Sequence, residues 1–331
     1  MFNQVTKIAL MVMFAFVIFH AGLQQVVAKT LLLSHQYSPN SNAGKLIEHW
    51  KDLVEERSSG KLRIEIHHSS SLYKANEIVE ALQLRSVPMG AGDRELVQFG
   101  LSELTLPFVF SSAAEVHKNA NRTMPVYSRT GITVLGYFVT DVRVFVSGQK
   151  MQIRQDVQWK SLWGIRGSVA RKIFSKNGFK IADRFDQKKV RSGKMISSVS
   201  LAQIEKLGIG KERFKYGRYL ALTKHAYEGT WLAINSDAYN SLEPEYRRIL
   251  EHTVREISQT AFQQVDRNIS SQVAELQNRG YSVETFDTPS AAIRVFRPDT
   301  VDKGDCTSGQ KKRDINGKCE CSSNTDYEEC K

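Results

Sequence analysis

The sequence predicts an α/β protein built from two lobes, and three features indicate this fold. Strand and helix patterns alternate over residues 31–85, which is typical of a parallel sheet covered by helices. About 300 of the 331 residues remain after an export signal, which is more than one small core usually contains. A long amphipathic helix follows Ser241, and we expect it to brace both lobes.

The first elements follow from hydrophobic periodicity. Residues 31–33 form a short apolar strand, and residues 43–57 form a helix whose apolar positions recur with a 3.6-residue period. Residues 62–66 alternate between apolar and charged side chains, which predicts a strand, and residues 76–85 predict a second helix. The apolar face of the first helix contains Leu46, Ile47, Trp50, Leu53 and Val54.

The middle of the chain predicts buried strands. Residues 131–139 form an apolar strand, and the valines at every second position from Val142 continue it. Alternation then places Arg143 and Phe145 on the opposite face. The remaining expected elements are strands at 160–167, 219–226 and 230–234 and a short helix that begins at Ile173 and is closed by Gly178.

The bracing helix begins within Ser241–Glu245, where acidic residues occupy the first turn, and Gly280 caps it. Its apolar stripe comprises Leu250, Val254, Ile257, Ala261, Val265, Ile269, Val273 and Leu276.

The N-terminus predicts export. Lys7 is the only charged residue before Lys29, residues 8–23 are almost wholly apolar, and small residues lead up to Ala28. We interpret residues 1–28 as a signal peptide that is cleaved after Ala28 in the periplasm; a membrane anchor is the alternative, but the run is short for a span. No other long apolar run follows, so we expect no direct membrane insertion after cleavage.

All four cysteines lie in a polar tail, residues 301–331. An exported chain would oxidise them to two disulfides, for which three pairings are possible. Cys319 and Cys321 are too close for an easy mutual bridge, so we expect each to pair with Cys306 or Cys330. A zinc site is the alternative, but the Cys-x-Cys spacing fits it poorly.

The charge pattern excludes several function classes. The formal net charge is +11, and the lysines and arginines are scattered rather than gathered into a stripe with aromatic residues, so we expect no nucleic-acid partner. The sequence has no His-Glu-x-x-His, Gly-x-Ser-x-Gly or glycine-rich phosphate loop, and no cysteine in its body. We therefore predict no enzyme, no metal and no cofactor; an anionic small ligand is compatible with the charge.

Five segments in the right order carry a resemblance to a known family. The chain resembles the substrate-binding subunits of tripartite ATP-independent periplasmic (TRAP) transporters, in the C4-dicarboxylate-binding family, over roughly residues 30–285. The resembling segments are 58–66, 104–110 (similar to LDLPFLF), 132–137 with Arg143 after it, 220–227 (similar to LSLTNHAY) and 237–250.

The resemblance implies a fold of the type II periplasmic binding protein kind, with the ligand between the lobes. Lobe I is expected to comprise residues 29–146 and 228–258, and lobe II residues 147–227 and 259–300 with the long connecting helix.

The resemblance also implies which residues bind. Arg166 closes the segment 156–166, the counterpart of the family's DLKGLKIR, and so matches its main ligand arginine; a structural salt bridge between the lobes is the alternative. Arg143 matches the second binding arginine, and Gln36 falls at a loop position that often contributes a polar contact. A guanidinium holds a carboxylate by two parallel N–H···O bonds, which suits an organic acid.

The chain departs from the family in residues 189–200, where the usual Asp-Gly and Glu-Asn pairs are missing. Ser198 and Ser200 offer hydroxyls there instead, and Trp231 is a candidate for the cleft wall, although core packing explains it equally well. We expect the ligand to close the lobes and the loaded protein to dock on a TRAP permease. The altered motif and the tail favour an alternative: an exported sensor or interaction module with altered or lost ligand binding.

Overall fold

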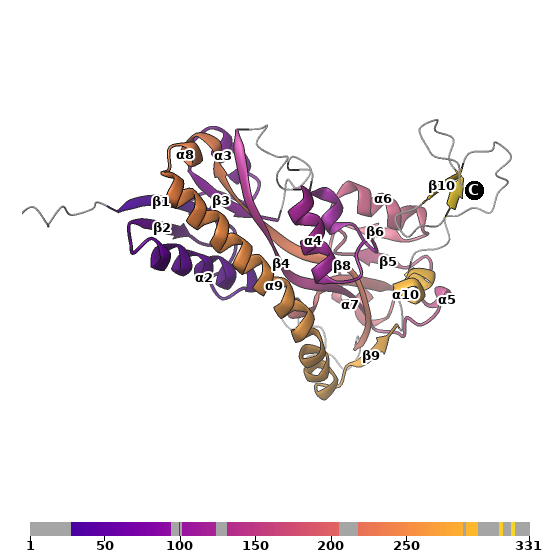
Figure 1. Ribbon diagram of the computed structural model, residues 1–331. Coiled ribbons are helices and arrows are strands. Elements are labelled where there is room, and N and C mark those ends of the chain that lie inside the picture. Colours follow the sequence, from indigo (N-terminus) through magenta and orange to yellow (C-terminus); the bar gives the residue numbers. More distant parts are fainter. Residues whose placement is uncertain are drawn as a thin grey trace, which may run out of the picture.

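Two strands run through both halves of the molecule. In the computed structural model they are β4 (Ile132–Ser147) and β8 (Tyr219–Asn235), which pair antiparallel along almost their whole length. Figure 1 shows one half on each side of this pair. The structure describes residues 28–93, 99, 101–123, 131–204, 218–286, 289–296, 311–313 and 319–321, the last two segments by their backbone path.

The first half contains three short strands that extend the sheet beyond β8. β1 (Lys29–His35) lies between β2 (Leu62–His67) and β3 (Met89–Gly92) and is parallel to both, while β3 continues antiparallel onto β8. Leu31, Leu33, Leu62 and Ile64 of β1 and β2 are buried and Leu32 and Ile66 are partly buried, which confirms the strand pattern. Over them pack α2 (Asn42–Arg57) and, at the far end, α3 (Ile78–Gln83).

The second half repeats the arrangement on the other side of β4. β7 (Met195–Ser200) pairs with β4, β5 (Ser161–Trp163) is parallel to β7, and β6 (Lys180–Ala182) is parallel to β5. The sheet order within the described residues is therefore β2-β1-β3-β8-β4-β7-β5-β6, with β9 (Ser282–Thr285) beside β8. The other helices are α4 (Ala113–Thr123), α5 (Arg154–Val157), α6 (Ser168–Lys176), α7 (Gln187–Arg191), α8 (Ser236–Asn240) and α10 (Pro289–Phe296), with short 3₁₀ turns at Ser102–Thr105 and Leu201–Gln203.

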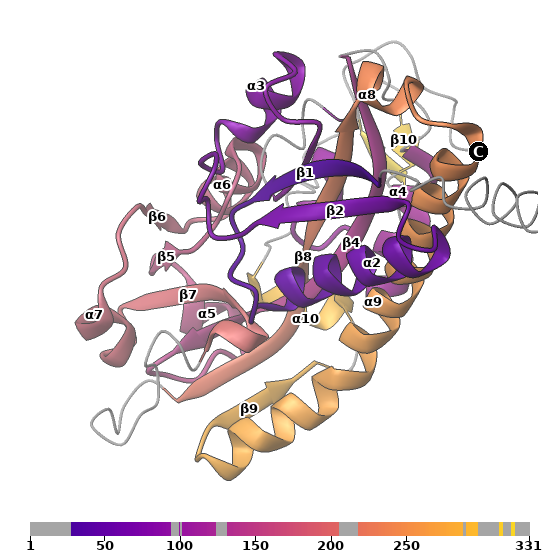
Figure 2. The same cartoon turned by 90° about the vertical axis from the view of Figure 1, so that its left-hand side faces the viewer.

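The predicted bracing helix is α9 (Pro244–Asn278), a single helix of 35 residues. It crosses the face of the sheet and packs on β4, α2 and α4 (Figure 2). The contact with β4 is close, because a Cβ atom at Gly136 would lie 2.1 Å from Val254 Cγ1. The fold prediction of two α/β lobes with a long bracing helix is confirmed.

Two strand predictions differ from the structure in their limits. The segments expected at 219–226 and 230–234 form the single strand β8, while the strand at 131–139 continues to Ser147 as expected. The strand expected over 160–167 ends at Trp163, since Gly164 takes the left-handed φ of 88°. The division into lobes stays a prediction; β4 and β8 contribute to both halves.

The tail and the signal peptide lie mostly outside the described residues. β10 (Lys311–Arg313) pairs antiparallel with β11 (Cys319–Cys321). The disulfide pairing and the cleavage after Ala28 stay predictions. Among the described helices, none has the length and apolar character needed to cross a membrane.

Candidate functional site

The candidate site starts at the carboxyl ends of β1 and β3. These strands are parallel neighbours in which His35 pairs with Ala91, so the residues that follow each strand meet at one edge of the sheet. Gln36 and Asp93 stand there, and the Gln36 amide Nε2 donates to Asp93 Oδ1 at 2.5 Å. The polar position that the sequence assigned to Gln36 is thus joined to a carboxylate.

Arg166 reaches this edge from the second half. It lies in the turn between β5 and α6, where Gly164 and Gly167 both have positive φ and Ile165 is buried in the core of the second half. The Arg166 side chain is 65% exposed, and its Nη1 donates to Asp93 Oδ2 at 2.7 Å. Asp93 therefore links the two halves through the arginine that the resemblance identified as the main ligand residue.

Gly164 is required by a close approach. A Cβ atom there would lie 2.1 Å from the carbonyl oxygen of Ser198 and 3.3 Å from Arg143 Nη2. The turn that carries Arg166 is therefore seated directly on β7 and β4.

Arg143 has a different environment, because its side chain is only 11% exposed. Nε donates to Ser198 Oγ at 3.1 Å, and Nη2 donates to the carbonyl oxygens of Gly164 (2.8 Å) and Ser198. Nη1 forms an ion pair with Glu228 on β8. Every nitrogen of this guanidinium has a partner in the protein, and the side chain ties β4 to β7, β8 and the Arg166 turn.

The electrostatics of the two arginines differ accordingly. Burial lowers the pKa of Arg143, as does Arg166, although Glu228 opposes both. Burial also acts to lower the pKa of Arg166, but the carboxylates of Glu228 and Asp93 outweigh it and raise that pKa. Both guanidiniums are charged at neutral pH.

A third carboxylate, that of Asp141, lies near Arg143. Asp141 is buried and accepts from the backbone N–H groups of Val142 (2.8 Å) and Ala202 (3.1 Å). Burial, with the nearby charge of Glu228, raises the pKa of Asp141 from 3.8 to about 7. Ser200, one of the predicted ligand serines, hydrogen-bonds to this carboxyl group and is 1% exposed.

The other predicted serine belongs to a buried chain of hydrogen bonds. Ser198 Oγ lies 2.9 Å from His225 Nε2, and the other ring nitrogen lies 2.9 Å from Thr223 Oγ1. The ring stacks on Phe145 with centroids 3.8 Å apart, and burial lowers the pKa of His225 well below its usual value. The imidazole is therefore neutral and holds Ser198 in position for Arg143.

Trp231 lies in the core of the first half. It is 1% exposed, packs on Phe99 with centroids 5.1 Å apart, and would touch a Cβ atom at Gly92. Core packing accounts for this residue, and ligand contact by Trp231, Ser198 or Ser200 stays a prediction.

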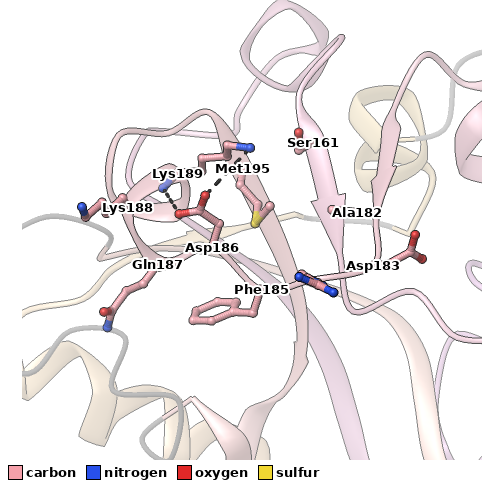
Figure 3. Close-up of a pocket in the computed structure, with 10 residues that line it drawn as sticks. Ser161, Ala182, Asp183, Phe185, Asp186, Gln187, Lys188, Lys189 and Met195 are labelled. Carbon is pink, nitrogen blue, oxygen red and sulfur yellow. Dashed lines mark hydrogen bonds and ion pairs between the residues drawn. The ribbon is translucent and has the colours of Figure 1, made fainter.

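An open groove of about 770 Å³ lies elsewhere in the second half (Figure 3). In it the backbone N–H of Lys189 donates to Asp186 Oδ1 at 3.1 Å, and the lysine ammonium lies 3.8 Å from Oδ2. Neither Arg143 nor Arg166 lines it. The lining residues are Ser161, Ala182–Lys189 and Met195.

Sequence reasoning missed the two carboxylates that pair with the arginines. Asp93 directly follows the small buried residues of β3, so its place at the strand end was a usable signal. Glu228 is the charged residue of the mostly apolar run 226–234 within β8, which itself indicates a buried partner.

Two α/β halves, joined by crossing strands and facing each other through an exposed arginine, define a two-lobed solute-binding protein. The chain belongs to the family described as bacterial extracellular solute-binding protein, family 7 (DctP), whose model matches residues 33–158 and 208–294.

Known relatives agree with this membership. The chain is 24% identical over 257 residues to the C4-dicarboxylate-binding protein DctB of Bacillus subtilis. The aligned region covers 72% of this chain and 70% of that protein. The fold is similar to a TRAP periplasmic solute-binding protein from Ochrobactrum anthropi (TM-score 0.71, 17% identity, 82% of this chain and 87% of that one). It is also similar to one from Pseudomonas aeruginosa with bound L-malate (TM-score 0.67, 18% identity, 82% and 98%).

Proposed function

We propose that this protein captures a small organic acid between its two halves in the periplasm and delivers it to the membrane permease of a TRAP transporter. The carboxylate of the ligand binds Arg166. Arg143 fixes the strands and the turn on which Arg166 stands, and it adds positive potential behind the site.

One observation carries the proposal: Arg166 is an arginine at the edge between the halves whose side chain is 65% exposed and already holds a carboxylate, that of Asp93. A ligand carboxylate would accept from this exposed guanidinium as Asp93 does. The relatives are consistent with an acid, since one is named for C4-dicarboxylates and one similar structure holds L-malate.

Periplasmic location is supported by the predicted signal peptide and by the extracellular character of the family. Binding without catalysis is supported by the family, which consists of solute-binding proteins. The alternative of a sensor or interaction module is favoured by the altered residues 189–200 and by the Cys-rich tail. The structure gives these serines internal roles, so their departure from the family pattern does not by itself argue for a lost ligand.

A thermal-shift screen of the mature protein against a panel of mono- and dicarboxylic acids, with hydroxy acids and α-amino acids included, tests the proposal. A ligand that binds the folded state raises the melting temperature, and at 100 times its Kd it stabilises by about 2.7 kcal/mol. We expect a subset of acids to raise the melting temperature of the wild type and to lose this effect in Arg166→Met. No shift with any acid would overturn the proposal.

A further inference from the structure

Asp93 determines what kind of acid the site accepts. Its two carboxylate oxygens are used by side chains from opposite halves: Oδ1 accepts from Gln36 at 2.5 Å and Oδ2 from Arg166 at 2.7 Å. The side chain is 24% exposed, so it stands at the surface of the site rather than in the core. A ligand carboxylate that binds Arg166 must lie next to this negative charge.

The charges at the edge are already balanced. Arg143 faces Glu228 and Arg166 faces Asp93, so among the described residues each guanidinium of the site has one carboxylate partner. One added carboxylate makes this group of charges negative, and a dicarboxylate makes it doubly so. Because like charges repel each other at short range, an added carboxylate binds poorly here unless the ligand also brings a positive charge.

Hydrogen-bond acceptors gather beside the guanidinium. A carboxylate offers about four lone pairs, of which Asp93 uses two in these bonds. Gln36 Oε1 is buried without a hydrogen-bond partner among the described residues, and it belongs to the same side chain that donates to Asp93. This edge suits a ligand that brings donors.

We propose that the ligand is a zwitterion of the α-amino acid type, whose carboxylate binds Arg166 and whose ammonium binds Asp93. Because Asp93 and Arg166 are in direct contact, the two ligand groups must also be close, as on adjacent carbons. The ammonium then lies between the ligand carboxylate and Asp93 and cancels their repulsion. The Asp93 side chain is the specificity-determining residue, because it rejects acids that lack the amine.

This inference rests on the proposed capture of an organic acid and narrows its class. The experiment uses calorimetric titration of the mature protein with matched probes: a set of L-α-amino acids, the 2-hydroxy acids with the same side chains, and C4 dicarboxylates. For the amino acid that binds best, we expect its hydroxy counterpart to bind at least tenfold more weakly, because a hydroxyl lacks the positive charge.

Asp93→Asn tests the residue itself. The substitution keeps the shape and removes the charge, so the amino acid should bind at least tenfold more weakly, while the hydroxy acid should bind equally well or better. Asp183→Asn is the matched control, because Asp183 is an exposed partner of Arg171 at 2.6 Å outside the edge; we expect no change in affinity. Circular dichroism checks that both variants are folded.

The outcomes separate the two proposals. Tighter binding of a hydroxy acid or a dicarboxylate than of any amino acid would overturn the zwitterion inference and leave organic-acid binding intact. Unchanged amino-acid affinity in Asp93→Asn would overturn the role of Asp93. Failure of every probe, with and without an amine, would overturn the proposed function.

Discussion

The two arginines of the site show how one residue type serves two purposes. Arg143 stands within β4, is 11% exposed and has a protein partner at every nitrogen. Arg166 stands in a turn after β5, is 65% exposed and is held to Asp93 at the boundary of the halves. The first is part of the frame, and the second is the group that a ligand can reach.

The difference follows from position in the sheet. A side chain in a strand shared by both halves is surrounded by neighbouring strands, so its charge must be neutralised inside the protein. A side chain just beyond the end of a strand faces the edge, where ligands of open α/β sheets bind. The account therefore predicts that substitution of Arg143 affects mainly stability and that substitution of Arg166 affects mainly affinity.

The largest expected effect on stability is that of Arg143→Met. The change removes the partner of Glu228, whose side chain is 19% exposed and lies near Asp141. Breaking a buried pair by removing one partner costs about 3–5 kcal/mol of unfolding free energy. Urea denaturation of the purified variant measures it.

Two further variants sharpen this result. Arg143→Met combined with Glu228→Gln should recover part of the loss, because no unpaired carboxylate is then left. Arg166→Met should cost less than about 1 kcal/mol, since exposed ion pairs contribute little. Equal losses for the two single arginine variants would remove the distinction between frame and ligand group.

The pH dependence of the unfolding free energy tests the environment of the buried Asp141. Its folded pKa of about 7 exceeds the ordinary value of 3.8, so the folded state binds more protons between these values and is destabilised as pH rises. Asp141→Asn lacks this titration. We expect the unfolding free energy of the wild type, relative to that of the variant, to fall by about 2–4 kcal/mol between pH 4 and pH 8.

Urea denaturation of both proteins across that pH range provides the measurement. The lowered pKa of His35, about 4, affects both proteins alike and cancels in the difference. The difference in unfolding free energy between the wild type and Asp141→Asn could also stay constant with pH. That result would mean that Asp141 titrates at its ordinary value and that Arg143 compensates for its burial.

Ser198→Ala should have a smaller effect than Arg143→Met or the titration of Asp141. It removes the acceptor of Arg143 Nε and one partner of His225, and a buried donor left without an acceptor costs about 1–2 kcal/mol. Ser192→Ala is the control, because its hydroxyl bonds to Lys189 O at the exposed end of α7 and should contribute less than about 0.5 kcal/mol. If the two variants were equally stable, the Ser198 network would not support Arg143.

Much of the fold could be predicted from the sequence, because α2, β1, β2 and α9 have periodic apolar faces that are buried as expected. β7 could not, since Ser197, Ser198 and Ser200 look like a polar surface in sequence yet are buried in the structure. Two of these serines are satisfied by partners that lie more than 20 residues away in the chain, which no local pattern reveals.

For the same reason, some residues of the site could be predicted from the sequence and others could not. Arg166 and Gln36 follow strands, and the structure brings both to Asp93. The partners Asp93 and Glu228 depend on how the strands assemble. Glu228 faces Arg143, 85 residues earlier in the chain, because Asp141 pairs with Glu228 across β4 and β8 in an alignment that includes register shifts. Pairing of this kind is fixed by the assembled sheet.

The most direct test of the account is the affinity of Arg166→Lys, measured by calorimetry with the best-binding acid from the screen. Lysine keeps the charge but cannot form two parallel bonds to a carboxylate, so binding should weaken by about 2–4 kcal/mol. The melting temperature without ligand should stay within a few degrees of the wild-type value. Unchanged affinity would contradict the account, as would a loss of affinity that is matched by a loss of stability, because either result would make Arg166 part of the frame.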